Sequence, residues 1–222
     1  MGNRCVIVGG AEIGQYARLR TLLRRDDDFF FCDCGLRHAK PLGVEPTLIV
    51  GDFDSYPRPN CKVETIVLPR EKDDTDTAFA AKEALRRGYR EVLLLGAVGQ
   101  RLDHTLGNVY LLLWLARRGV RARLVDDYSE MELIGREGAE ISDGFAYFSL
   151  LNITGRASGI TVTGAKYPLA DAEISSEYQY GISNEVQPGG TARVSVARGE
   201  LLLVKVYGAA DSGNGGGYGA LG

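Results

Sequence analysis

The sequence of 222 residues has few histidines and cysteines and no long apolar stretch. Its four cysteines, at positions 5, 32, 34 and 61, lack the C-x2-C spacing of a zinc knuckle, so we expect reduced thiols in a cytoplasmic protein. No segment reaches the roughly 18 consecutive apolar residues of a membrane helix, and the N-terminal residues lack the design of a signal peptide. We therefore expect no membrane as a partner.

An excess of positive charge is also missing. The chain carries 26 Lys and Arg against 29 Asp and Glu, a net charge of −3. Because nucleic acids select strongly basic surfaces, we expect no nucleic acid partner. The hydrophobic fraction of 45% is ordinary for a globular protein, and the length predicts one large or two modest domains.

The first 126 residues alternate short apolar runs with helical segments, the pattern of a parallel sheet covered by helices. Strands are predicted at residues 5–8, 29–32, 48–50, 63–67, 91–95 and 120–125, and helices at residues 12–25, 77–87 and 106–118. A short helical turn is expected over residues 36–40. We predict an α/β domain over residues 1–126, with three layers and a mainly parallel sheet.

The pattern changes after residue 126. Helical runs give way to short alternating stretches that Gly and Pro interrupt, as in sandwich folds. We predict a second, all-β sandwich domain over residues 127–208. Residues 209–222 are rich in glycine and are predicted to be a disordered tail.

Two carboxylates follow the predicted strand at residues 48–50. The sequence there is Gly-Asp-Phe-Asp-Ser, and in an extended chain Asp52 and Asp54 project to the same side. Ligands of open α/β sheets bind beyond the carboxyl ends of the strands. Two carboxylates this close repel each other unless a cation or a shared proton relieves them. A plain Asp-rich turn is the alternative.

Other acids lie at comparable places. Asp33 ends another predicted strand, and Asp103 follows the strand at residues 91–95. Asp73 and Asp76 stand at the start of a predicted helix, where they would share one face. Helix capping explains one or two aspartates within residues 73–76, but not three. Although a solvated acidic face is possible, clustering at one sheet edge favours Mg²⁺ that bridges phosphates.

A glycine-containing loop follows the strand at residues 91–95. Gly96 and Gly99 would let backbone amides approach phosphate oxygens, and Arg101 can bind a phosphate in a forked geometry. G-x-x-G alone is a weak signal, and the dinucleotide fingerprint G-x-G-x-x-G is absent after the earlier glycine pair. His104 is equally consistent with an ordinary residue at a helix start.

In order and approximate spacing, these motifs resemble those of bacterial thiamine pyrophosphokinases, from about residue 5 to residue 206. The resemblance rests on the segments at residues 33–35, 51–55, 71–76 and 96–104 and on Ser183-Asn184. Two positions depart from the family pattern: Cys34 replaces a common glycine, and Gln100 replaces the second glycine of Gly-Gly-Arg. Gln100 would change how closely the backbone approaches a nucleotide.

The resemblance implies transfer of pyrophosphate from ATP to the hydroxyl of thiamine, which gives thiamine diphosphate and AMP, in a homodimer with sites at the subunit interface. It assigns the first domain to nucleotide and metal and the second to thiamine and dimerisation. The implied Mg²⁺ ligands are Asp52, Asp54, Asp73 and Asp76. The implied catalytic residues are these four with Asp33 and Arg101. ATP binding is implied for Lys72, Gly96, Gly99, Arg101, Asp103, His104 and Thr105, and thiamine binding for Ser183 and Asn184.

The residues also allow other interpretations of the thiamine site and of the activity. Without the family, an ordinary turn would be preferred for Ser183 and Asn184. Tyr178 and Tyr180 could form an aromatic wall for the thiazolium cation or simply alternate along a strand. A Mg²⁺-dependent phosphohydrolase could use the same acidic edge with water as nucleophile, and a nucleotide or vitamin sensor could bind without turnover.

Overall fold

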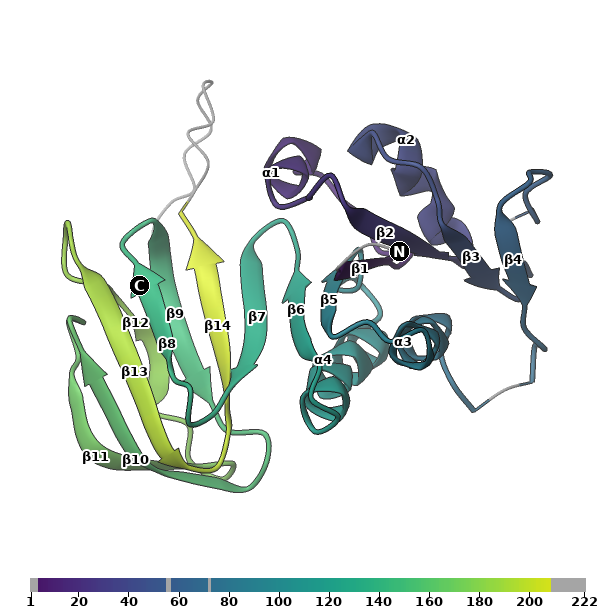
Figure 1. The fold of residues 1–222 in the computed structure, drawn as a ribbon. Coiled ribbons are helices and arrows are strands. Elements are labelled where there is room, and N and C mark those ends of the chain that lie inside the picture. The colour runs from purple at the N-terminus through teal and green to yellow at the C-terminus, as the bar shows by residue number, and fades with distance from the viewer. Residues whose placement is uncertain (1–3, 55–56, 72, 209–222) are drawn as a thin grey trace. The chain divides into compact units, whose positions relative to one another are not determined.

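The structure, a computed structural model, describes residues 4–54, 57–71 and 73–208. It divides into two compact units, Met1–Leu133 and Ile134–Gly222 (Figure 1). The first unit ends seven residues after residue 126, the predicted end of the first domain. It is longer because strand β7 (Ser129–Ile134) pairs antiparallel with β6 (Arg121–Val125). The predictions for Lys72 and for the glycine-rich tail lie outside the described residues.

The first unit contains a mainly parallel sheet, which confirms the predicted α/β class. Every pair of neighbours is parallel except β6 and β7. In the order of the sheet its strands are β7, β6, β5 (Glu91–Leu95), β1 (Arg4–Val8), β2 (Asp27–Cys32), β3 (Leu48–Gly51) and β4 (Glu64–Val67). The central strands are buried on both faces, which explains their continuous apolar runs.

Helices cover both faces of this sheet, so the unit has three layers: α1 and α2 lie on one side and α3 and α4 on the other (Figure 1). The helices are α1 (Tyr16–Thr21), the 3-10 helix η1 (Asp33–His38), α2 (Ala39–Leu42), α3 (Asp76–Arg86) and α4 (Leu102–Ala116). Helix α1 is shorter than predicted because residues 9–15 form an irregular loop. No helix in the described part of the chain is long and apolar enough to span a membrane.

The register of the parallel strands brings their carboxyl ends together. Val8 of β1 lies opposite Phe31 of β2 and Leu95 of β5, and Val50 of β3 lies opposite Cys32. The segments that follow β1, β2, β3 and β5 therefore begin side by side at one edge. Because this is the edge where open α/β sheets bind ligands, the register positions the candidate site.

The second unit contains two antiparallel sheets that share one core, which confirms the predicted all-β sandwich. Phe148 and Leu203 from one sheet and Ile160 and Val194 from the other belong to the same buried cluster. In sheet order the first has β12 (Gly181–Asn184), β9 (Phe145–Leu151) and β14 (Leu201–Tyr207), and the second has β11 (Leu169–Ser175), β10 (Arg156–Thr163), β13 (Thr191–Arg198) and β8 (Ala139–Ser142).

Candidate active site

Three aspartates meet at the carboxyl edge of the parallel sheet. Asp33 follows β2 directly, and Asp52 and Asp54 follow β3. One carboxylate oxygen from each lies within 4.8 Å of the others. Asp33 is buried, Asp52 is half-buried and Asp54 is exposed, so the cluster opens to solvent on one side. Like charges this close favour a bound cation, and carboxylate oxygens suit a hard divalent ion.

The backbone around the cluster has a glycine in close contact with Asp33 and two residues in the left-handed region of φ. A Cβ on Gly51 would lie 3.1 Å from both Cα and Cβ of Asp33, so a side chain at this position would press on that aspartate. Asp33 and Phe53 have φ angles of +44° and +55°, which L-residues adopt at some energetic cost. The N–H of Asp54 donates to Oδ1 of Asp52 at 3.3 Å. The fold therefore maintains a strained arrangement where the acids converge.

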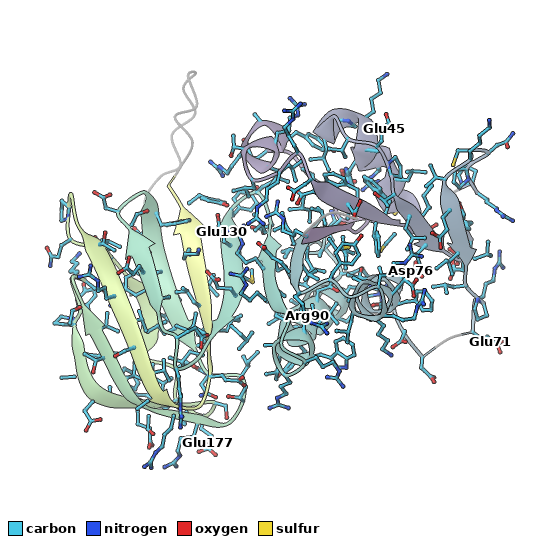
Figure 2. The ribbon with its side chains drawn as sticks, viewed as in Figure 1. Glu45, Glu71, Asp76, Arg90, Glu130 and Glu177 are labelled. Atoms are coloured by element: carbon cyan, nitrogen blue, oxygen red, sulfur yellow. The ribbon has the colours of Figure 1, made fainter. Side chains whose placement is uncertain are left out.

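Asp76 is the first residue of helix α3 (Figure 2). The helix start is fixed by Thr75, whose Oγ1 accepts a hydrogen bond from the N–H of Ala78 at 3.2 Å. Burial raises the pKa of the Cys32 thiol, and the charge of Asp76 and then that of Asp33 raise it further. The carboxylates of Asp76 and Asp33 therefore act on the same buried thiol.

Asp73 lies elsewhere. It precedes the capping Thr75 and is exposed, so it does not share a helical face with Asp76 as the sequence suggested. Asp73 instead lines a cleft of about 530 Å³ between α3 and α4, together with Asp103, His104, Tyr110 and Trp114. The volume is in the range of small-ligand sites. Of the predicted site residues, Asp73, Asp103 and His104 thus line this cleft, apart from the acid cluster of Asp33, Asp52 and Asp54.

The loop after β5 is held from two sides. A Cβ on Gly96, whose φ is +56°, would lie 2.5 Å from the carbonyl oxygen of Gly9, so only glycine fits. Asn108 of α4 donates from Nδ2 to the carbonyl of Ala97 at 2.8 Å, and Oγ1 of Thr105 accepts from the N–H of Gly99 at 3.1 Å. Asn108, a buried amide within an otherwise apolar helix segment, is not among the residues predicted from the sequence.

Arg101 stands at the start of α4 and binds its near neighbour Asp103 in a forked geometry. Nε donates to Oδ1 at 2.9 Å and Nη2 to Oδ2 at 2.6 Å, and both side chains are exposed. The guanidinium lowers the pKa of the Asp103 carboxyl. The carboxylate pre-orients the arginine, and an incoming phosphate would compete for the same donors.

In the second unit, Asn184 and Ser183 have different environments. Asn184 is buried and forms two hydrogen bonds with the backbone of Tyr167: Oδ1 accepts from its N–H at 3.0 Å and Nδ2 donates to its carbonyl at 2.7 Å. Ser183 is exposed, has a φ of +56° and donates its N–H to Oγ of Ser149 at 3.0 Å. Asn184 therefore fixes the segment at Tyr167, whereas Ser183 presents its hydroxyl at the surface.

The first unit is an α/β domain with an acidic sheet edge beside a glycine loop, and an antiparallel sandwich follows it. This combination of fold and site is that of an enzyme built from two structural units. Residues 19–124 match the family model "Thiamin pyrophosphokinase, catalytic domain" and residues 139–201 match "Thiamin pyrophosphokinase, vitamin B1 binding domain". Thiamine pyrophosphokinase of Bacillus subtilis (strain 168) is 30% identical over 172 residues, which are 73% of this chain and 79% of that protein. The chain belongs to the thiamine pyrophosphokinase family.

Solved structures show the same fold. The thiamin pyrophosphokinase of Geobacillus thermodenitrificans superposes with a TM-score of 0.79 at 29% identity, over 95% of this chain and 99% of that one. The thiamin pyrophosphokinase of Candida albicans has a TM-score of 0.74 at 14% identity, over 93% and 90%, and at this identity the likeness is one of fold alone.

Proposed function

We propose that this chain transfers the pyrophosphoryl group of ATP to the hydroxyl of thiamine, giving thiamine diphosphate and AMP. The observation that carries the proposal is the convergence of Asp33, Asp52 and Asp54 at the carboxyl edge of the sheet, in a member of this family. The reaction requires attack on the β-phosphorus, with the α-phosphate as leaving group. Positioning and charge neutralisation supply most of the catalysis in such transfers.

We assign the metal to Mg²⁺. Asp52 and Asp54 would hold it, together with Asp76 from the start of α3. A metal contact from Asp73, which lines the cleft, stays a prediction from the sequence. The fit rests on the oxygen-only donor set and on the 4.8 Å grouping of Asp33, Asp52 and Asp54. When bound, Mg²⁺ supplies the positive charge that neutralises the transferred phosphates. Asp33, the buried member, would accept the hydroxyl proton of thiamine.

ATP would bind along the glycine loop and the start of α4. The backbone at Gly96 and Gly99 would lie along the phosphates, and Thr105 and Asn108 hold the loop in shape. Arg101 would move from its partner Asp103 to a phosphate oxygen. His104 contributes to the cleft wall. A phosphate contact from Lys72 stays a prediction from the sequence.

We propose residues 127–208 as the thiamine-binding and dimerisation part and residues 1–126 as the nucleotide- and metal-binding part. Ser183 would contact thiamine directly, whereas Asn184 would act by fixing the segment at Tyr167. A homodimer is supported by exposed apolar side chains on both units, among them Leu106 and Tyr110 of α4 and Ile182 of β12. The cytoplasmic location stays a prediction.

The first test measures products. Purified protein is incubated with ATP and Mg²⁺, with and without thiamine. Release of AMP only in the presence of thiamine supports the transfer. Free phosphate without an acceptor would instead indicate a phosphohydrolase, and ATP binding without any product would indicate a sensor.

The second test changes one acid. Asp54→Asn removes a charge from the exposed side of the cluster, so we expect turnover to fall by about two orders of magnitude with the fold intact. Asp143→Asn is the matched control, because Asp143 lies in the second unit and accepts from the N–H of Gly189, which asparagine also does. Activity of Asp54→Asn at the wild-type level would refute the metal assignment.

A further inference from the structure

The loop between β1 and α1, residues 9–15, supports the glycine loop that follows β5. The N–H of Ala11 donates to the carbonyl of Gly96 at 2.9 Å. A Cβ on Gly99 would lie 2.9 Å from Cβ of Ala11. The two loops are therefore packed backbone to backbone, and a displacement of the first displaces the second.

Two consecutive side chains of η1 hold this supporting loop. Arg37 donates from Nη2 to the carbonyl of Gly10 at 2.7 Å and to Glu12 at 2.9 Å. His38 contacts the next carbonyl, that of Ala11, through Nε2 at 2.9 Å. His38 is only 1% exposed, so its ring is packed in place.

The contacts of His38 determine which ring nitrogen carries the proton. A carbonyl oxygen only accepts, so Nε2 must carry hydrogen toward Ala11. Nδ1 then accepts from the hydroxyl of Tyr16, the first residue of α1, at 2.7 Å. Nε of Arg37 lies 3.4 Å from Nε2, a longer contact than the one to Ala11, and an Nε2 that carries hydrogen cannot accept from it. Burial lowers the pKa of His38, and the charge of Arg37 lowers it further, which favours the neutral ring.

The far end of the loop is fixed as well. The Asp127 carboxylate, in the turn between β6 and β7, accepts from the N–H of Gly14 at 2.6 Å and of Gln15 at 2.9 Å. Arg18 of α1 donates to the Asp127 carbonyl at 2.7 Å. The loop is thus anchored at both ends, with His38 and Arg37 at the end nearest the glycine loop.

We propose that His38 is a positioning residue that sets the distance between the acid cluster and the glycine loop. Helix η1 begins with Asp33 of the acid cluster and ends with His38, which holds Ala11 and through it Gly96. One six-residue element thereby connects the proposed metal side of the site to its proposed phosphate side. The inference rests on the proposed function, because it assumes that ATP occupies the glycine loop.

The experiment measures ATP binding with Mg²⁺ by calorimetry, together with the KM values for ATP and thiamine. For His38→Leu we expect roughly a tenfold rise in the ATP dissociation constant and an unchanged KM for thiamine. His38→Gln keeps a donor for Ala11 and an acceptor for Tyr16, so it should bind ATP within about twofold of the wild type. Tyr16→Phe should give an intermediate loss, about threefold.

Tyr89→Phe is the control for a merely structural role. It removes a part-buried hydrogen bond to Asp28 near the opposite edge of the same sheet, so it should lower stability and leave ATP binding unchanged. Wild-type affinity in both His38→Leu and Tyr16→Phe would overturn the proposal, as would equal losses for ATP and thiamine. If His38→Leu does not fold, wild-type affinity in Tyr16→Phe alone overturns it. Absence of ATP binding by the wild type would overturn the proposed function itself.

Discussion

At the scale of single residues, the acid cluster depends on a position that carries no side chain. Gly51 is the last residue of β3 and lies next to Asp33. Its missing Cβ leaves room for the positive φ at that aspartate. The carboxylates of Asp52 and Asp54 can then reach Asp33. The site is therefore sensitive to the smallest change at Gly51.

Gly51→Ala tests this dependence. The added methyl would lie 3.1 Å from Asp33 Cα and Cβ, so we expect Asp33 to shift by a few tenths of an ångström. Overpacking of this kind costs about 1–2 kcal/mol in the free energy of unfolding. We expect the Mg²⁺ concentration for half-maximal turnover to rise roughly tenfold. Gly208→Ala, which has open space around its Cβ, should change neither quantity.

His38 makes a second prediction at this scale, on the pH dependence of stability. Its pKa is lowered from 6.5 by burial, with Arg37 adding to the effect and Glu12 opposing it. The folded state thus favours the neutral ring, and its contribution is complete above pH 6.5 and is lost as the pH falls below that value. In urea unfolding, the stability difference between wild type and His38→Gln should decrease from pH 7 to pH 5. A constant difference would show that His38 does not titrate differently on folding.

At the scale of elements, the C-terminal end of α3 is attached to strand β4 by a charged network. Buried Glu83 accepts from Arg86 at 2.6 and 2.7 Å and from Arg87 at 2.7 Å. Arg87 continues to Glu64 of β4 at 3.0 Å. The opposite end of α3 begins with Asp76, so this network helps to fix the helix that carries Asp76.

Glu83→Gln should weaken this attachment. Hydrogen bonds from Arg86, and then from Arg87, lower the pKa of Glu83 from 4.5 to about 2. The carboxylate therefore stabilises the fold above pH 4.5, and the gain is lost as the pH falls toward 2. We expect the substitution to cost roughly 1–3 kcal/mol at pH 7 and less at pH 3, measured by urea unfolding. Exposed Glu45 supplies the control, since Glu45→Gln should change stability little at either pH.

At the scale of the whole molecule, each unit leaves apolar side chains in water. Tyr178 is 69% exposed and Ile182 is 54% exposed on the second unit, and Leu106 and Tyr110 are exposed on α4 of the first. Surfaces of this kind commonly mark interfaces. They are the physical support for the proposed homodimer.

Sedimentation velocity tests the assembly. We expect a particle of about twice the chain mass of 24.1 kDa, with Ile182→Asp shifted toward the monomer, because a charge buried without a partner disfavours association. Ser195→Asp adds the same charge at an exposed position of β13 in the other sheet, and should leave the dimer intact. A wild-type monomer at micromolar concentration would contradict the proposal.

The sequence predicted most of the fold because the fold depends on local patterns. Strand β5 was predicted with its observed bounds, since the apolar run at residues 91–95 begins and ends abruptly. Helix α1 was overestimated because apolar periodicity over residues 12–25 continues through a loop that tertiary contacts, such as those of Asp127, hold out of the helix. Strand β7 was placed with the second domain because alternation does not show which neighbour a strand pairs with.

By itself, the sequence determined the residue types of the candidate site: aspartates after strands, glycines after β5 and an arginine at a helix start. These follow from the chemistry of each segment and from the strand ends that precede them. Only the tertiary structure decided which acids meet, that Asp73 lines the cleft instead, and that His38 and Asn108 support the glycine loop. Such contacts join segments distant along the chain, and their distances depend on strand register and backbone packing.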